Sequence, residues 1–246
     1  MRTVSCVVVI MLLCASVPAS AGNKDFSATF DRCGEFVGIG YVPAERARSL
    51  VPSQYTLAVV DTNAQLVVRV ASCAEVSVDG KKSGPARTAQ IGVMLEGPDG
   101  SANINNYLLW FVTDSGKLHG KLQAAGIQNG NDQQLQFAFE SIGGTGTLSV
   151  DVSAPRFPAF PLFGNVTNAP ADPPISFVAS WFADGKHGAL RMQTRFEQLR
   201  FGKTDIVLTP SPDSELATLI GSPSLSFEVL NSYNEWQTAT MQATLQ

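Results

Sequence analysis

The sequence is poor in charged residues and in histidine. Of its 246 residues, 15% are charged and two are histidine, and the formal net charge is −4. A nucleic-acid-binding domain needs a basic face, so this charge balance argues against nucleic acid as a partner. No run of like charges is present, and the sequence therefore predicts no electrostatic attachment to a membrane surface.

Familiar catalytic signatures are also absent. The sequence contains no G-x-S-x-G, H-E-x-x-H, G-x-G-x-x-G or EF-hand pattern, and these mark serine hydrolases, metalloproteases, dinucleotide-binding folds and calcium sites. His119 and His187 stand beside glycines, and neither neighbours a cysteine. We therefore expect no metal site and no cofactor. A Ser-His-Asp triad or a carboxylate pair stays open, because both assemble in space.

The first residues read as a secretory signal peptide. Arg2 gives a positive start, Val7 to Leu13 is an apolar core, and Ala19 to Ala21 is a small-x-small cleavage site. The apolar run is too short for a membrane span, so a retained anchor is the weaker interpretation. We expect residues 1–21 to be removed and residues 22–246 to form the mature domain.

Two cysteines remain once the signal is removed. Cys6 and Cys14 lie within it, whereas Cys33 and Cys73 belong to the mature chain. A lone cysteine pair in an exported protein predicts a disulfide, with two buried free thiols as the alternative. The sequence thus predicts a secreted or periplasmic protein with no stable membrane insertion after cleavage.

The chain is rich in strand patterns. Leu135, Phe137 and Phe139 alternate with polar residues, and Asp-Gly pairs such as Asp79-Gly80 supply hairpin turns. The clearest helix signals are few and short. One follows Pro43, and another has Asp213 as its expected N-cap. These features predict one β-rich α+β domain, closed as a barrel or cone, with two or three short helices.

A proline-rich segment, Pro155 to Pro174, interrupts the strand patterns. Six of its first nine residues are proline or phenylalanine, and three more prolines follow. Proline cannot donate to a sheet ladder, so we expect neither a central strand nor a helix here. A surface loop is one interpretation, and an aromatic lid over a pocket that includes Phe160 is the other.

A central stretch carries the first candidates for chemistry. Tyr107 to Val112 is continuously apolar, as expected for a strand buried on both faces, and Thr113 to Gly116 ends it. Lys117 and Lys121 follow at i, i+4 spacing, which places both on one face of a short helix. They are either solvated lysines on a connector or desolvated amines able to act as nucleophiles.

Glu75 is the carboxylate that stands out. It lies in a strand-like segment, Ser72 to Val78. A charge in a strand usually faces solvent. If Glu75 instead faces a barrel interior, it needs a lysine or arginine partner.

The order of these elements resembles the acetoacetate decarboxylase-like superfamily. Tyr41 to Pro52 resembles the family's short helix ending in Leu-Val-Pro. Glu75 falls where the family has a Tyr-x-Glu strand whose glutamate lines the active site. Leu208 to Gly221 and Phe227 to Tyr233 are similar to its C-terminal helix and final strands. The resemblance covers most of the mature chain and implies a β-cone with an internal cavity, and family members often form homo-oligomers.

One departure decides what the resemblance implies for catalysis. In the family's decarboxylases a Gly-Arg-Glu and then a Gly-Phe/Tyr-Pro-Lys follow the central strand, and that lysine forms a Schiff base with the keto acid. Here Gly126 matches the second glycine, but Ile127-Gln128 stands in place of Pro-Lys. Lys121 could replace the missing amine only if it points into the cavity.

The sequence therefore predicts an exported protein that binds a small apolar or carbonyl-containing ligand without decarboxylating it. The alternatives are a Schiff-base decarboxylase or lyase acting on a small keto acid through Lys121 and Glu75, and a structural secreted protein without a ligand. The residues that line the ligand site are expected to be Glu75, Trp110, Lys117, Lys121 and Phe160, although Trp110 also suits an ordinary core position.

Overall fold

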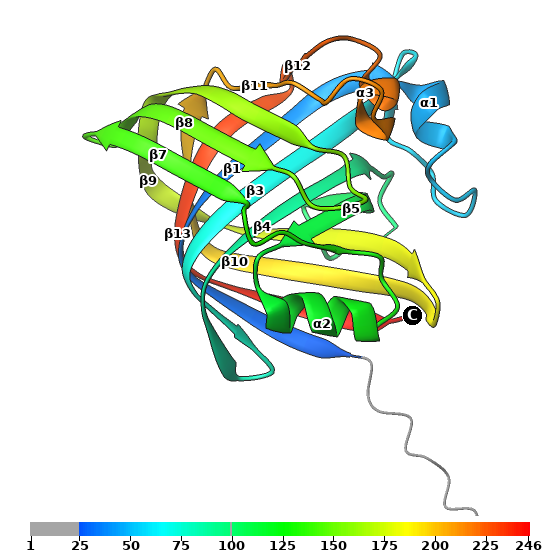
Figure 1. Ribbon diagram of the computed structural model, residues 1–246, viewed down its shortest axis with the longest axis horizontal. Coiled ribbons are helices and arrows are strands. Elements are labelled where there is room, and N and C mark those ends of the chain that lie inside the picture. The colour runs from blue at the N-terminus through cyan, green and yellow to red at the C-terminus, as the bar shows by residue number, and fades with distance from the viewer. Residues whose placement is uncertain (1–24, 99) are drawn as a thin grey trace, which may run out of the picture.

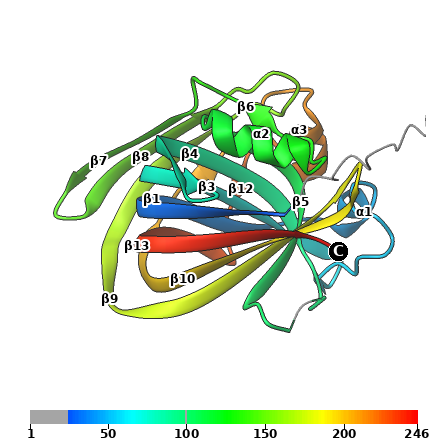
Figure 2. The same ribbon diagram turned by 90° about the horizontal axis from the view of Figure 1, so that it is seen from below.

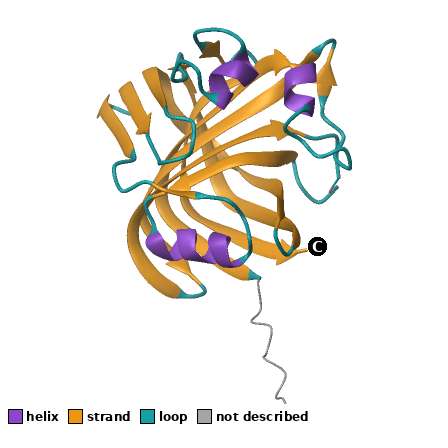
Figure 3. Cartoon of the chain, turned by 45° about the vertical axis from the view of Figure 1, so that its right-hand side comes forward, coloured by secondary structure: helices purple, strands orange, loops and turns teal. Residues whose placement is uncertain are grey.

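The computed structural model describes residues 25–98 and 100–246, so the predicted signal peptide lies outside the described residues. Three short helices, α1 (Ala44–Arg48), α2 (Gly116–Ala124) and α3 (Glu215–Ile220), accompany the strands. Figure 3 shows how small a share of the chain they form. The strands are β1 (Phe26–Pro43), β2 (Val59–Val60), β3 (Asn63–Val78), β4 (Lys81–Met94), β5 (Ile104–Thr113), β6 (Gly130–Asn131), β7 (Gln136–Ile142), β8 (Thr145–Val152), β9 (Phe160–Gly185), β10 (Gly188–Thr204), β11 (Val207–Leu208), β12 (Leu225–Ser226) and β13 (Leu230–Leu245).

Seven long strands close into a ring. Their order is β9-β10-β13-β1-β3-β4-β5, and β5 then pairs in parallel with β9 between Ile104–Tyr107 and Ala179–Phe182. The other pairings around the ring are antiparallel. Figure 1 shows these strands curving together beneath a second layer. The closed, β-rich single domain predicted from the sequence is confirmed.

Inside the ring lies one apolar cluster, the inner core. All seven ring strands contribute to it, with side chains such as Phe26, Phe111, Trp181 and Trp236. Helix α2 adds Leu118, Leu122 and, just beyond its end, Ala125 and Ile127. Figure 2 shows α2 next to β6 at one edge of the molecule. The helix thus closes one end of the ring with its apolar side.

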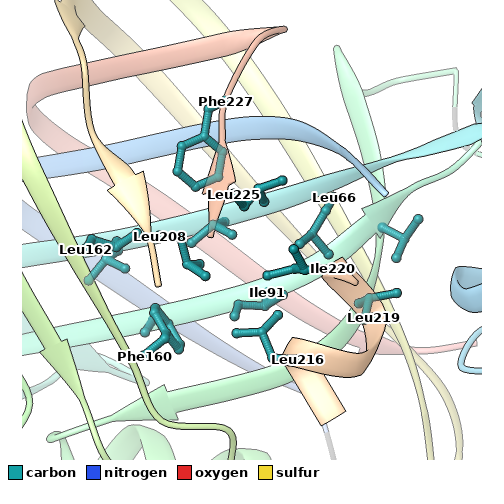
Figure 4. Close-up of a cluster of buried hydrophobic side chains, with 14 of the residues drawn as sticks. Leu66, Ile91, Phe160, Leu162, Leu208, Leu216, Leu219, Ile220, Leu225 and Phe227 are labelled. Carbon is teal, nitrogen blue, oxygen red and sulfur yellow. The ribbon is translucent and has the colours of Figure 1, made fainter. Parts of the chain in front are cut away.

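A second cluster, the outer core, lies on the opposite face of β1, β3, β4 and β5. It is covered by β7, β8, the first part of β9, β11, β12, α1 and α3. Figure 4 shows its side chains converging from these elements. They include Leu66, Ile91, Phe160, Leu162, Leu208, Leu216, Leu219, Ile220, Leu225 and Phe227.

The central strand is buried on both faces, as predicted. On β5, Leu108 and Phe111 belong to the inner core, whereas Tyr107 and Val112 belong to the outer core. The following helix, α2, begins after Ser115, whose side chain accepts a hydrogen bond from the Leu118 amide at 3.4 Å. Both the continuous apolar run and the short lysine-bearing helix are therefore confirmed.

The prediction that Pro155 to Pro174 forms no central strand is wrong, because this part of β9 pairs with β8 on one side and with β11 on the other. From Phe160 onward this segment is the first half of β9, which pairs with β8 between Phe160 and Val166. The prolines are accommodated because Pro161 lies at the start of the strand, and the later ones lie where the β9–β10 register shifts irregularly. Proline is tolerated at such positions because the ladder is already interrupted there. Phe160 is buried in the outer core, so it is not part of a lid.

The expected N-cap of α3 is also wrong by one residue. Ser214 caps the helix and accepts from the Ala217 amide at 3.0 Å. Asp213 instead has φ 61°, in the left-handed region, so its backbone turns the chain before the helix begins. A left-handed aspartate is an accepted turn residue.

The predicted disulfide is present. Cys33 and Cys73 are direct cross-strand neighbours on β1 and β3, with Cα atoms 4.1 Å apart, and both lie in the inner core. Among the described residues, no helix has both the length and the apolar character that a membrane crossing would require.

Candidate functional site

A cavity of about 180 Å³ lies inside the ring. Its walls come from β1, β3, β5, β9, β10 and β13, and almost all of its lining atoms are apolar. Ligand pockets for drug-sized molecules are typically roughly 300–1,000 Å³, so this cavity suits a smaller molecule. It is lined by Glu35, Val37, Ile39, Val67, Arg69, Ile104, Phe177, Ala179, Trp181, Phe196, Leu199, Phe201, Leu230 and Asn234.

The cavity lies away from α2, toward the other end of the ring. Helix α2 is tied to the β3–β4 turn by an ion pair between Lys121 and Asp79 at 2.5 Å. The cavity wall of β1 lies farther along that strand, at Glu35, Val37 and Ile39. Phe201, one of the residues that line the cavity, is 36% exposed.

Two glycines on the outer face of β1 lie beneath aromatic rings of the outer core. Gly34 and Gly38 lie on its outer face, where a Cβ on Gly34 would be 2.4 Å from the Tyr233 hydroxyl oxygen and one on Gly38 would strike Phe227. These glycines leave room for both aromatic rings in the outer core. Because side chains alternate along a strand, Glu35 between them points inward.

Glu35 forms an ion pair with Arg69 inside the ring. The Arg69 Nε–H donates to Glu35 Oε1, and Arg69 is 8% and Glu35 2% exposed. Arg69 also donates from its NH1 group to Gln90 Oε1 at 2.6 Å. Asn234 donates to Glu35 Oε2 at 3.4 Å. A buried charge needs such partners, and here both charges have them.

Aromatic rings complete the surroundings of Arg69. Its guanidinium carbon lies 5.6 Å from the centroid of Phe196 and 5.8 Å from that of Trp236. The faces of aromatic rings attract cations at this range. The guanidinium is therefore held by a carboxylate, an amide and two rings, which fixes its position in the cavity wall.

Burial dominates the titration of Glu35. Removal from water raises the pKa of its carboxyl above the ordinary value of 4.5, while the charge of Arg69 and the hydrogen bonds from Asn234 and Arg69 act in the opposite direction. The cavity wall therefore contains a carboxyl group whose ionised form is disfavoured by burial and favoured by Arg69 and Asn234. Perturbed carboxyls of this kind occur at functional sites.

The structure places the predicted site residues outside this cavity. Glu75 lies near the hairpin end of β3 and pairs with Lys82 at 2.9 Å. Lys117 and Lys121 line a different pocket, of about 440 Å³, between α2 and the β3–β4 turn. Lys117 donates to the Lys82 carbonyl, and the Lys121 side chain is 42% exposed. The two lysines are thus brought together, but not with Glu75 or with the cavity.

Trp110 and Phe160 are also separated from the cavity. Trp110 packs against the outer core and lines a pocket of about 220 Å³ that includes Asp184 and Glu215. Phe160 is buried in the outer core. No lysine lines the cavity in the described part of the chain.

The sequence-based reasoning missed Glu35 and Arg69. A signal for Arg69 was available, since it interrupts the apolar strand Leu66-Val67-Val68 and Val70-Ala71. A single charge within such a run predicts a buried ion pair. Its partner could not be identified, because Glu35 becomes a neighbour only through the β1–β3 register, in which it lies opposite Ala71 and diagonal to Arg69.

Comparisons with known proteins identify the fold. An acetoacetate decarboxylase-like enzyme from Sphingomonas wittichii RW1 matches with a TM-score of 0.53 and 12% identity, covering 93% of this chain and 94% of that one. An acetoacetate decarboxylase structure matches with a TM-score of 0.58 and 12% identity over 89% and 88% of the two chains. The enduracididine biosynthesis enzyme MppR, in complex with pyruvate, matches with a TM-score of 0.54 and 10% identity over 92% and 90%.

Comparisons of sequence alone give no match. No family model matches the chain, and no curated protein does. At 10–12% identity the structural matches concern the fold and not the chemistry. The matches nevertheless cover about nine-tenths of each chain, and this protein has the acetoacetate decarboxylase-like fold.

Proposed function

We propose that this chain is an exported protein that binds a small apolar or carbonyl-containing molecule inside its ring, without decarboxylating it. The observation that supports binding is the apolar cavity with a small polar group in its wall, formed by Glu35, Arg69 and Asn234. Small-molecule sites commonly combine apolar walls with a few fixed polar groups. The buried Cys33–Cys73 disulfide supports export, because disulfides persist in oxidising compartments.

The absence of lysine from the cavity lining of the described residues is the reason to propose binding without decarboxylation. Schiff-base chemistry needs an amine held in a desolvated pocket next to the substrate. Lys117 and Lys121 lie at the outer side of α2, in contact with solvent. The pyruvate complex of MppR shows that another protein of this fold holds a small carbonyl compound. The same kind of ligand is within the proposal here.

Titration with a series of 2-alkanones, from 2-butanone to 2-octanone, tests binding. Trp181 lines the cavity, so its fluorescence reports occupation. Each methylene group contributes roughly 0.8 kcal/mol when buried, so affinity is expected to rise with chain length until the cavity is full. The absence of any saturable signal across the series would overturn the proposal.

A cavity-filling variant locates the ligand. Ala179→Leu adds three carbons to a wall residue, and we expect it to abolish binding of the longer ketones while the protein stays folded. Ala138→Leu makes the same change at an exposed position of β7 and serves as the control. If both variants bind like the unchanged protein, the ligand is not in the ring. Incubation with acetoacetate is expected to release no carbon dioxide beyond the buffer rate.

A further inference from the structure

Asn106 on β5 is a buried amide without a partner. Its side chain is 0% exposed, and neither its oxygen nor its nitrogen makes a hydrogen bond within the described part of the chain. A buried amide that gives up water and gains no partner is unfavourable, and folded proteins contain few of them. Such a group is more easily understood as part of a site that a ligand completes.

The register of the sheet directs Asn106 toward the cavity. Residues two apart on a strand share a face, so Asn106 faces the same way as Ile104. In the parallel β5–β9 pairing, Ile104 lies opposite Ala179 and Asn106 lies opposite Trp181. Ile104, Ala179 and Trp181 all line the cavity. The amide of Asn106 therefore belongs to the inner face of the ring, directly beside the cavity wall.

The polar side chains that line the cavity itself already have partners. Arg69 is bound to Glu35 and Gln90, and Glu35 also accepts from Asn234. An ionic ligand would therefore meet a charge pair that is already matched. The indole N–H of Trp236, which packs against Arg69, is a further buried donor without an acceptor among the described residues. The interior thus offers uncharged hydrogen-bonding groups rather than free charge.

An asparagine amide presents one kind of complementarity. Its oxygen accepts and its NH₂ group donates, side by side in one plane. A second amide or a lactam matches this arrangement with two hydrogen bonds. A carboxylate offers acceptors only and an ammonium group offers donors only, and each would add an unmatched charge to an apolar cavity.

We propose that Asn106 determines specificity by pairing with an uncharged amide-type group, a carboxamide or lactam, on an otherwise apolar ligand. This inference rests on the binding function proposed above and names its ligand class more narrowly. In the bound state both atoms of the Asn106 amide are satisfied, and the apolar part of the ligand lies against Trp181 and Ala179. The charge pair of Glu35 and Arg69 stays intact and forms part of the wall.

A matched series of six-carbon compounds tests the choice of head group. Hexanamide, hexanoate, hexylammonium and 1-chlorohexane share a similar chain and differ in hydrogen bonding and charge. At neutral pH, hexanamide is expected to bind the unchanged protein at least about tenfold more tightly than each of the others, as two added hydrogen bonds would give. Equal or tighter binding of hexanoate or hexylammonium would overturn the inference.

Variants at Asn106 assign the preference to this residue. Asn106→Val removes the amide with little change in size, and we expect it to bind hexanamide and 1-chlorohexane equally. Asn106→Thr keeps a donor and an acceptor and should restore part of the preference. Asn168→Leu, at an exposed position of β9, is the control and should change nothing. A preference that survives Asn106→Val would refute the assignment.

The two proposals fail in different ways. If none of the four compounds binds and no 2-alkanone binds, the binding function itself is wrong. If 1-chlorohexane and hexanamide bind with the same affinity, the ring binds ligands but Asn106 does not select an amide. The measurements on the unchanged protein decide this even if Asn106→Val does not fold.

Discussion

Arg69 donates its Nε–H to the carboxylate of Glu35 inside a closed ring of strands, 34 residues away in sequence. The contact joins neighbouring strands, β1 and β3. Hydrogen bonds from Asn234 and to Gln90 extend it onto β13 and β4. Four consecutive strands of the ring are therefore linked by one row of polar side chains. Three members of this row, Glu35, Arg69 and Asn234, form the polar part of an otherwise apolar cavity.

Removing one member of the charge pair should be far more costly than removing both. Arg69→Met leaves a buried carboxylate without its counter-charge, and we expect it to lower the free energy of unfolding by about 3–5 kcal/mol. The double variant Glu35→Leu/Arg69→Met should recover most of this loss, because neither charge remains to be desolvated. Urea unfolding of the four proteins of this cycle gives the coupling directly. Additive losses would contradict the pairing.

The same cycle predicts a pH dependence with a definite sign. The pKa of Glu35 is raised in the folded state above its ordinary value of 4.5, so the folded protein holds this proton more tightly than the unfolded chain. The stabilisation is fully present below pH 4.5 and is lost as pH rises through the raised pKa. Relative to the double variant, the unchanged protein should therefore become less stable from pH 4.5 upward.

Asp79 does not confuse this measurement. Its hydrogen bond with Lys121 lowers the pKa of Asp79 below 3.8, so its contribution is lost at lower pH and has the opposite sign. Both proteins contain the Asp79–Lys121 pair, so its contribution cancels when the free energy of unfolding of one protein is subtracted from that of the other. A stability difference that is constant from pH 4.5 to neutral pH would show that the folded state does not raise the Glu35 pKa.

The disulfide should contribute strongly to stability. Cys33 and Cys73 are 40 residues apart, and closing a loop of that length stabilises by roughly 4 kcal/mol in the chain-entropy model. We expect Cys33→Ala/Cys73→Ala to lose about this amount in chemical denaturation. The intact mass of the unchanged protein should increase by two hydrogens on reduction. An unchanged mass would mean that the two thiols are free.

Elements defined by local patterns were predictable from the sequence. The run Tyr107 to Val112 had to be buried on both faces, and the spacing of Lys117 and Lys121 favoured the helix that follows. The closed ring followed from the density of strands. Local composition gave a wrong prediction for Pro155 to Pro174. The β9–β10 register is irregular there, so β9 contains prolines that a regular ladder of hydrogen bonds would exclude.

The candidate site was beyond reach of the sequence because it depends on register. Glu35 and Arg69 meet through the alignment of β1 with β3, and Asn106 is placed opposite the cavity residue Trp181 by the parallel pairing of β5 with β9. Neither pairing has a signature in the residues themselves. Glu75 drew attention instead, since its strand resembled a family motif, yet its side chain pairs with Lys82 near a hairpin.

The roles of Lys117 and Lys121 as amine nucleophiles remain a prediction that one experiment decides. Treatment with a β-keto acid and borohydride would reduce any Schiff base to a stable adduct, visible in the intact mass. We expect no adduct, because neither lysine reaches the ring cavity and their pocket is open to solvent. A desolvated environment is what makes a lysine amine reactive at neutral pH.

The control for this experiment separates specific from random modification. Lys121→Met removes the lysine that is paired with Asp79 and leaves Lys117 in the same pocket. An adduct that disappears in this variant would support a lyase acting at the surface of α2. Its substrate would then lie between α2 and the β3–β4 turn, outside the ring. Absence of an adduct in both proteins, together with saturable ketone binding, is the combination expected if ligands are held in the ring without a covalent bond.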